Sequence, residues 1–329
     1  MLARLRTPFR RHFYRRLLAA TLVGLVGIVS CTQLDAWQRQ AIFSPEADQS
    51  RWWREPLPGT EVFDLTLDNG DRVHAWYWQH PHADAPTVLY LHGSRWNLNG
   101  SVFRMARWTE MGNSVLAIDY RGFGKSTPLL PSDESALQDA AAALQELARR
   151  QPDPARRFVY GHSLGGAVAI DLAARPGSPP FAGLIVESTF TSISAMLGTL
   201  EWGKLPGASL LVTQPFASVQ KLAEVTTPML LVHGTADRVV PHTMSDELFA
   251  AAVSVPADMK RLVKIDGASH SGAVRSGEVY ESAIKTFIRD AGDAYAGSRP
   301  ARAHAPRSPA AETGHIENIA VSADDNARR

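Results

Sequence analysis

Short apolar runs that alternate with helical stretches constrain the fold of this chain more than any other feature. Six runs of six or seven residues each end in a polar residue or a glycine. A strand buried on both faces has this pattern, and strands that alternate with helices form a mostly parallel sheet with helices on both faces. The sequence therefore predicts an α/β fold. The predicted strands are 87–92, 114–119, 157–162, 183–188, 228–234 and 261–266, and the predicted helices are 101–112, 134–151, 164–175, 242–252 and 273–290.

Two further segments add to this sheet. Residues 61–67 and 71–79 alternate apolar and polar side chains around Asp68-Asn69-Gly70, which is typical of a β-hairpin. Residues 189–226 are apolar but broken by Gly and Pro, which predicts short helices. Because this insertion lies between two predicted strands, we expect a small helical cap over the strand ends; a simple cover for the core is the alternative.

Changes in composition mark the ends of the predicted domain, residues 60–291. Residues 37–59 before it are rich in Trp, Gln and Pro and are expected to be a connector. Residues 292–329 after it are rich in Ala, Arg, Pro, Ser and Asp and almost lack aromatic side chains. Such a segment buries little apolar surface, so we expect a disordered tail.

Residues 1–36 are expected to be an export signal or a membrane anchor. Six arginines precede the first acidic residue, Asp35, and the uncharged apolar run 17–30 follows them. Cys31, the only cysteine, ends the stretch IVSC, which resembles the lipobox of bacterial lipoproteins. The alternative is a small hydrophobic residue inside an anchor helix. Both interpretations attach the protein to a membrane, with the folded domain on the periplasmic or extracytoplasmic side.

Charge and motifs argue against several other functions. The formal net charge is +1, and removing the six N-terminal arginines leaves −5, so we expect no surface suited to nucleic acid. His80-Pro81-His82 lacks the spacing of a zinc site. GFGKS, residues 122–126, is not a P-loop because Asp119 stands where the first glycine is required. We therefore expect no metal and no cofactor, and a structural turn at GFGKS.

Ser163 is the centre of the predicted chemistry. Gly161-x-Ser163-x-Gly165 lies between a predicted strand and a predicted helix, which is the setting of a nucleophile elbow. This turn strains the serine backbone and brings neighbouring segments so close that glycine is favoured two residues before and after it. The pattern predicts that Ser163 is a nucleophile. His162, in the same turn, is expected to point away from the site.

A serine nucleophile needs a base, and the base needs an acid to orient it. His270 follows the last predicted strand and is the expected base. Asp237 follows the strand before it and is the expected acid. With Ser163, these residues would lie at the same edge of the sheet, where ligands bind in folds of this class. The competing residues near these strand ends are Glu187, as an alternative acid, Asp266 and His242.

Acyl transfer also needs two hydrogen-bond donors for the oxyanion. The first is the backbone N–H of Leu164, the residue after the nucleophile. The second is expected from the loop after strand 87–92, where His92-Gly93 precedes Ser94. We predict the Ser94 N–H as this donor, with Arg95 as the alternative.

The chain carries, in order, the motifs LYLHGS, IDYRGFGKS, YGHSLGGAVAIDLA, LIVESTF, LLVHGTADRVVP and IDGASHSG, with WQRQAIFSP before the domain. It resembles a membrane-associated α/β-hydrolase of the serine-aminopeptidase-like branch over about residues 60–290. Relatives in that branch include esterases, lysophospholipases and thioesterases that remove fatty acyl groups from proteins. The resemblance implies an α/β-hydrolase fold and a serine hydrolase of carboxylic esters or thioesters, with Ser163, His270 and Asp237 as its triad and an acyl-enzyme intermediate.

The expected partners are a small-molecule or lipid-like ester, or an acylated protein, and a membrane contacted by the N-terminal segment. The apolar insertion 189–226 favours a substrate with an acyl or other apolar group. One alternative is a serine aminopeptidase, which would need a carboxylate such as Glu187 to hold the substrate amine. An alternative of another class is a membrane-tethered binding protein without catalysis, against which an intact triad argues.

Overall fold

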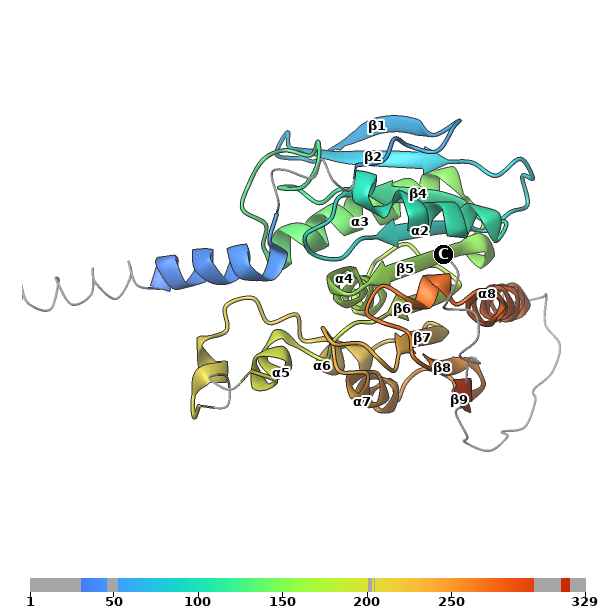
Figure 1. Cartoon of the computed structure of the whole chain (residues 1–329). Coiled ribbons are helices and arrows are strands. Elements are labelled where there is room, and N and C mark those ends of the chain that lie inside the picture. The colour runs from blue at the N-terminus through green and yellow to red at the C-terminus, as the bar shows by residue number, and fades with distance from the viewer. Residues whose placement is uncertain (1–30, 46–52, 201–202, 204, 299–314, 320–329) are drawn as a thin grey trace, which may run out of the picture.

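A computed structural model describes residues 31–45, 53–200, 203, 205–298 and 315–319. Within these residues a single sheet has the strand order β1-β2-β4-β3-β5-β6-β7-β8-β9 (Figure 1). Strands β4 to β9 in this order pair in parallel, and β1 and β2 form an antiparallel hairpin that joins β4. The strands are β1 Glu61–Thr66, β2 Arg72–Trp78, β3 Thr87–Leu91, β4 Ser114–Ile118, β5 Arg157–His162, β6 Gly183–Glu187, β7 Met229–Gly234, β8 Lys260–Ile265 and β9 His315–Ile319.

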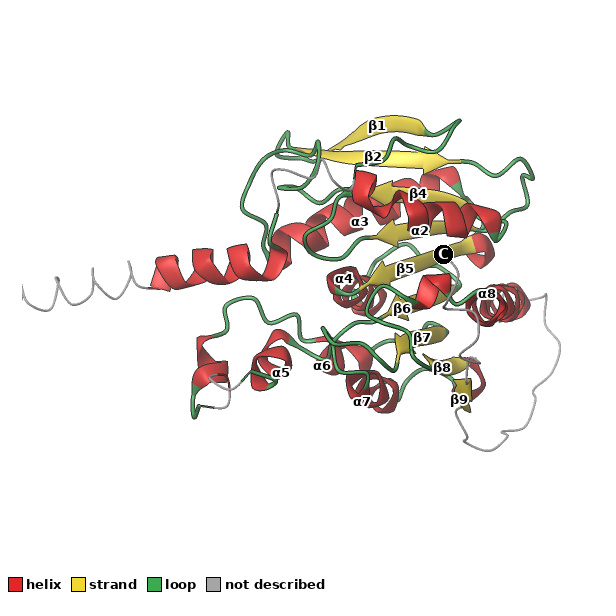
Figure 2. Ribbon diagram, viewed as in Figure 1, coloured by secondary structure: helices red, strands yellow, loops and turns green. Residues whose placement is uncertain are grey.

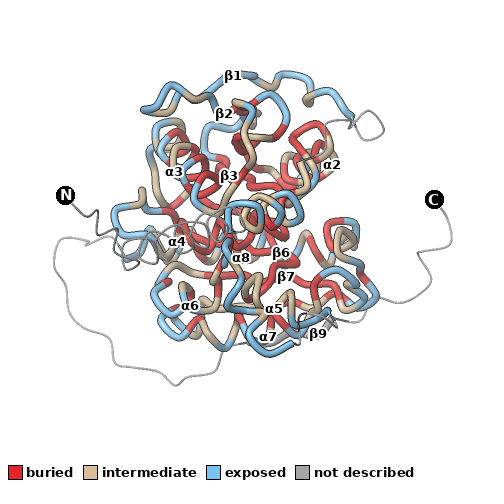
Figure 3. Tube along the Cα trace, turned by 90° about the vertical axis from the view of Figure 1, so that its left-hand side faces the viewer, coloured by how far each residue is buried: buried red, intermediate tan, exposed pale blue. Residues whose placement is uncertain are grey.

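The predicted α/β class, hairpin and parallel strands are confirmed, because continuous apolar runs form the buried centre of the sheet (Figure 3). Helices α2 and α8 pack on one face, and α3, α4 and α7 pack on the other (Figure 2). Each face therefore has its own apolar cluster. The helices are α2 Leu98–Glu110, α3 Asp133–Arg150, α4 Leu164–Ala174, α5 Ile193–Gly198, α6 Ser218–Leu222, α7 Thr243–Ala251 and α8 Glu278–Ser298.

The insertion 189–226 divides into two parts with different roles. Its second part covers the core, because Phe216 and Leu222 of the α6 region are buried. Its first part, α5 and the short 3-10 helix η3 (Ala208–Leu211), contains no buried residue. The second part is therefore the simple cover for the core, and the first part corresponds to the predicted helical cap.

Residues 31–43 form a helix, called here the N-terminal helix, and the predicted boundary between residues 36 and 37 falls inside it. Phe43 is fully buried, with its ring centroid 5.8 Å from that of Phe216. The Gln38 amide donates to the Leu211 carbonyl at 2.7 Å. The helix therefore lies against the insertion, as Figure 1 shows in blue and yellow, and is no loose connector.

Cys31 is the first residue described in this helix and is exposed. The predicted apolar run 17–30 lies outside the described residues. Among the helices that the structure describes, none is long and apolar enough to cross a membrane.

The predicted domain end at residue 291 is too early. Helix α8 continues to Ser298, because Tyr295 lies one turn after the buried Ala291 and packs against the same apolar cluster. Residues His315–Ile319 form β9, which pairs in parallel with β8 at the edge of the sheet. The remainder of the predicted tail, residues 299–314 and 320–329, lies outside the described residues.

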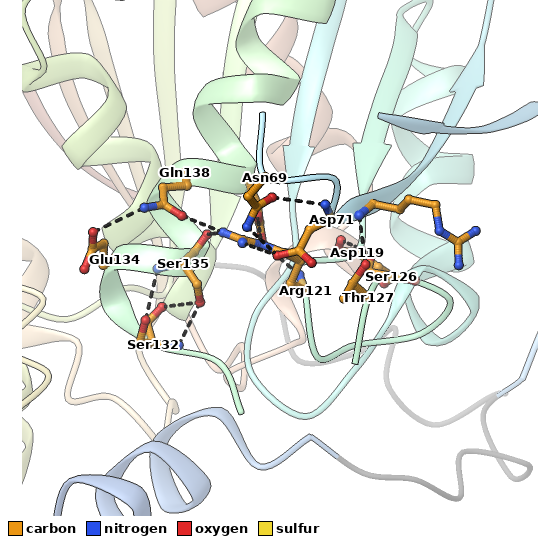
Figure 4. A network of polar contacts seen from close by, with 12 residues as sticks. Asn69, Asp71, Asp119, Arg121, Ser126, Thr127, Ser132, Glu134, Ser135 and Gln138 are labelled. Atoms are coloured by element: carbon orange, nitrogen blue, oxygen red, sulfur yellow. Dashed lines mark hydrogen bonds and ion pairs between the residues drawn. The ribbon is translucent and has the colours of Figure 1, made fainter. Parts of the chain in front are cut away.

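The stretch IDYRGFGKS forms a structural turn after β4, as expected. Ser126 donates to the Asp119 carbonyl at 2.6 Å and accepts the backbone N–H of His74 from β2 at 2.8 Å. Arg121 of the same turn donates to Asp71 at 2.8 Å and to Gln138 of α3 at 2.7 Å (Figure 4). The turn therefore holds the hairpin against the parallel sheet.

Candidate active site

The predicted nucleophile elbow is present between β5 and α4. Ser163 has a φ of +54° and a ψ of −118°, a strained conformation for a residue with a side chain. A Cβ added to Gly161 would lie 2.1 Å from the Gly165 carbonyl oxygen, and one added to Gly165 would lie 2.2 Å from the Leu91 carbonyl oxygen. The close approach of β3, β5 and α4 thus requires glycine at both positions and holds Ser163 above the sheet.

The structure brings Asp237 and His270 together. The Nδ1 atom of His270 lies 2.7 Å from Oδ2 of Asp237, and Nε2 of His233 lies 3.1 Å from the same oxygen. The other oxygen, Oδ1, accepts the backbone N–H groups of Val239 and Val240 at 2.8 and 2.9 Å. Burial raises the pKa of the Asp237 carboxyl, but the hydrogen bonds from His233 and His270 outweigh burial and hold that pKa well below its usual range. The Asp237 side chain is therefore an ionised carboxylate that fixes the His270 ring.

Ser163 and His270 line one cavity of about 450 Å³. Leu164 and Ser94, the predicted oxyanion donors, line the same cavity. Arg95 also lines it and has a φ of +73°, but its backbone N–H donates to the Phe43 carbonyl at 2.9 Å. This hydrogen bond occupies the alternative donor and ties the loop after β3 to the end of the N-terminal helix.

The competing residues have other partners. Asp266 accepts a hydrogen bond from Thr235 at 2.8 Å, and His242 lies 3.3 Å from the Lys264 ammonium. Glu187 is fully buried. The geometry favours Asp237 over all of them as the partner of His270.

Glu187 belongs to a buried network behind the cavity. Its carboxylate accepts from Arg104 at 2.7 Å and from the hydroxyls of Tyr160 and Tyr280 at 2.8 Å each. Arg104 of α2 and Glu187 are 1% and 0% exposed. The carboxylate therefore neither reaches His270 nor faces a substrate. This network was not predicted, although Arg104 lies one helical turn before the apolar Trp108 on the buried side of α2.

The prediction that His162 points away from the site is wrong. Its ring lines the catalytic cavity and lies 5.0 Å from the His270 ring, centroid to centroid. The Nε2 atom of His162 is 3.0 Å from Arg104 and 3.0 Å from the His270 carbonyl oxygen. This nitrogen accepts from Arg104 in one tautomer or donates to the carbonyl in the other, and either hydrogen bond keeps the ring on this side. Burial, reinforced by the charge of Arg104, lowers the pKa of His162 well below its usual value. A neutral imidazole therefore supports the loop that carries His270.

Comparisons with known proteins agree with this fold. The family described as serine aminopeptidase, S33, matches residues 82–219. An uncharacterized protein of Mycobacterium tuberculosis is 33% identical over 279 residues, covering 84% of this chain and 96% of that protein. A lysophosphatidylserine lipase of Danio rerio is 31% identical over 194 residues, covering 54% of this chain and 50% of that protein.

Among solved structures, an esterase of Pyrococcus furiosus has a TM-score of 0.56 at 20% sequence identity. The similarity covers 70% of this chain and 92% of that esterase, and at this identity it shows the fold alone. The sequence relatives and the sheet topology together lead to one conclusion. The chain is a hydrolase that belongs to the α/β-hydrolase superfamily.

Proposed function

We propose that this hydrolase cleaves carboxylic esters or thioesters through an acyl-enzyme on Ser163. The observation that carries the proposal is the strained turn of Ser163, in one cavity with a His270 ring that is hydrogen-bonded to a buried carboxylate. This arrangement supports general-base activation of a hydroxyl without any cofactor.

The proposed reaction has two halves. His270 takes the proton of the Ser163 hydroxyl while Asp237 holds the imidazole in the required orientation, and the serine oxygen attacks the substrate carbonyl. The backbone N–H groups of Leu164 and Ser94 hold the resulting oxyanion. The tetrahedral intermediate collapses and His270 protonates the departing alcohol or thiol. A water molecule, deprotonated by His270, then attacks the acyl-enzyme and releases the carboxylic acid.

The lining of the catalytic cavity favours an apolar group in the substrate. Ile42 from the N-terminal helix and Phe190, Ile193 and Met196 from the insertion all face it. No aspartate or glutamate belongs to this lining in the part of the chain that the structure describes. A peptidase that releases N-terminal residues needs an anion for the substrate amine, and Glu187, the one predicted for this role, is enclosed by Arg104. These features support an ester or thioester over an aminoacyl substrate.

The proposal extends to the place where the enzyme works. We propose attachment to a membrane through residues 1–36, by the apolar run 17–30 or by a lipid on Cys31, with the domain on the extracytoplasmic side. The six arginines before the run support this orientation. Cleavage before Cys31 and retention of an uncleaved anchor would both keep the whole N-terminal helix. The proposed substrates are then lipid-like esters or acylated proteins at the membrane surface.

A fluorophosphonate probe tests the nucleophile. The full-length protein should be labelled on the peptide that contains Ser163, and Ser163→Ala should abolish the labelling. Ser271→Ala removes another hydroxyl that lines the same cavity, so this control should still be labelled. Absence of labelling in a folded protein, or labelling of Ser163→Ala at the same rate, would overturn the proposal.

A further inference from the structure

A second cavity of about 910 Å³ lies between the N-terminal helix, the insertion and the loop after β7. Leu34 and Trp37 of the helix, Leu197 and Leu205 of the insertion, and Val239 of the loop are among its apolar walls. Its volume falls in the range of cavities that enclose small organic ligands. Nothing in the proposed reaction of Ser163 uses this space.

The second cavity adjoins the catalytic one. Five residues line both of them: Ala41, Ile42, Ile193, Met196 and Val239. All five are apolar, so no buried charge separates the two spaces at this junction. A substrate held at Ser163 could therefore extend an apolar group across the junction from one cavity into the other.

Most of the large apolar side chains that remain exposed after folding line the second cavity. Among the described residues, nine large hydrophobic side chains are exposed, and five of these nine line this cavity. Exposed apolar side chains scattered singly need no explanation, but a contiguous group marks a binding surface. The five are Trp37, Leu200, Leu205, Leu211 and Val239.

The N-terminal helix is held in place as one wall of this space. Gln38 donates to the Leu211 carbonyl at 2.7 Å and accepts the Thr213 backbone N–H at 2.9 Å. At the end of the helix, the Phe43 carbonyl accepts the Arg95 backbone N–H at 2.9 Å. The helix thus connects the wall of the second cavity to the loop that carries Ser94.

We propose that the N-terminal helix is a substrate-binding element, and that the second cavity holds the acyl chain of a long-chain ester or thioester whose carbonyl lies at Ser163. This inference rests on the proposed esterase function and names its substrate class. An acyl chain fits because it is apolar, like the five side chains that line both cavities, and needs no polar partner along its length. Burial of each methylene in this cavity would raise kcat/KM by up to about fourfold.

The test compares nitrophenyl esters of acetate, butyrate, octanoate and laurate on the full-length protein. The wild type should show kcat/KM that rises with chain length. Ala41→Trp places a large side chain at the junction and should lower the ratio of kcat/KM for laurate to kcat/KM for acetate at least about tenfold, which corresponds to the loss of one to two buried methylenes. Gln40→Trp places the same indole at the neighbouring position, which is also exposed but lines neither cavity, so its chain-length profile should match the wild type.

A second pair of variants tests the part of the second cavity that shares no residue with the catalytic cavity. Leu205→Asp places a charge in the lining and should reduce laurate hydrolysis selectively. Leu210→Asp changes an exposed leucine of the same insertion that does not line the cavity, and should have no selective effect.

The outcomes separate the two proposals. If Ser163 is not labelled by the fluorophosphonate, the esterase proposal fails and this inference fails with it. If Ser163 is labelled but kcat/KM is flat with chain length, or if Ala41→Trp and Gln40→Trp give the same profile, the inference is wrong and the esterase proposal stands.

Discussion

Replacing Arg104 by methionine should destabilise the fold strongly. The arginine is 1% exposed and donates to a glutamate, Glu187, that is 0% exposed. Methionine leaves the carboxylate with only the hydroxyls of Tyr160 and Tyr280, each at 2.8 Å, to replace the lost cation. Removing one partner of a buried ion pair costs about 3–5 kcal/mol, a large share of the roughly 5–15 kcal/mol that stabilises a domain.

Urea unfolding followed by circular dichroism measures this loss. With a slope of about 3 kcal/mol per M, a loss of about 3–5 kcal/mol lowers the midpoint by at least about 1 M. Arg107→Met on the same helix is the control, because Arg107 is 28% exposed and pairs with Glu110 and Glu281 at the surface. Each of these two pairs is worth about 0–1 kcal/mol. Equal losses in the two variants would refute the reasoning.

A double variant separates charge from packing. Arg104→Met with Glu187→Leu removes both charges, so no buried carboxylate remains without a cation, and part of the stability should return. The hydroxyls of Tyr160 and Tyr280 lie close enough to bond to each other, so only one of them would then lack an acceptor, which leaves a residual loss of about 1–3 kcal/mol. A double variant no more stable than Arg104→Met would mean that packing, rather than the unpaired charge, explains the loss.

Asp237→Asn should lower kcat for ester hydrolysis on the order of 10⁴-fold with little change in KM, because the amide favours the wrong tautomer of the imidazole; a loss below tenfold in steady-state kinetics would remove Asp237 from the triad. His162→Gln should change how stability depends on pH. Burial lowers the pKa of His162 well below its usual value, so the unfolded chain binds a proton below about pH 6.5 that the folded chain does not. Above about pH 6.5 the buried neutral ring of His162 costs the fold nothing. As the pH falls below this value, protonation of the unfolded chain lowers the free energy of unfolding by up to about 1.4 kcal/mol per pH unit. The difference in unfolding free energy between wild type and His162→Gln, measured from about pH 7 to about pH 5, should show that slope, and a constant difference would contradict it.

Local patterns were enough to predict the sheet and the elbow. The run RFVYGH is mostly apolar and forms the buried strand β5. Gly161 and Gly165 around Ser163 indicate a close approach of neighbouring backbone segments, which the structure shows directly. The loops that carry Asp237 and His270 follow from the same rule, because the carboxyl ends of parallel strands meet at one edge.

The errors have different causes. The Trp and Gln content of residues 37–43 favours a connector, and this composition hides a helix. The residues that face the insertion and the cavities, at positions 34, 37, 38, 41 and 42, nevertheless repeat at helical spacing. The sequence therefore contained the signal for this helix. It contained no signal for the orientation of His162, because that orientation depends on Arg104 from α2 and on the His270 carbonyl, which only the tertiary fold brings within 3.0 Å.

The division of the insertion 189–226 has a consequence for how the enzyme can diversify. The side chains of α5 and η3 form much of the second cavity, yet none of them is buried in the core. Substitutions there should alter which substrates are accepted. Variants at the exposed residues 209–211 of η3 should mostly still fold, because exposed positions tolerate change to within about 0.5 kcal/mol. Ile193, Ala195 and Met196 of α5 are half-buried against the core, so they tolerate apolar replacements best. Phe216 and Leu222, a short distance along the chain, have no such freedom. A mutant library aimed at new specificity should therefore randomise Ala208–Leu211 fully, restrict Ile193–Gly198 to apolar residues, and leave the remainder of the insertion fixed.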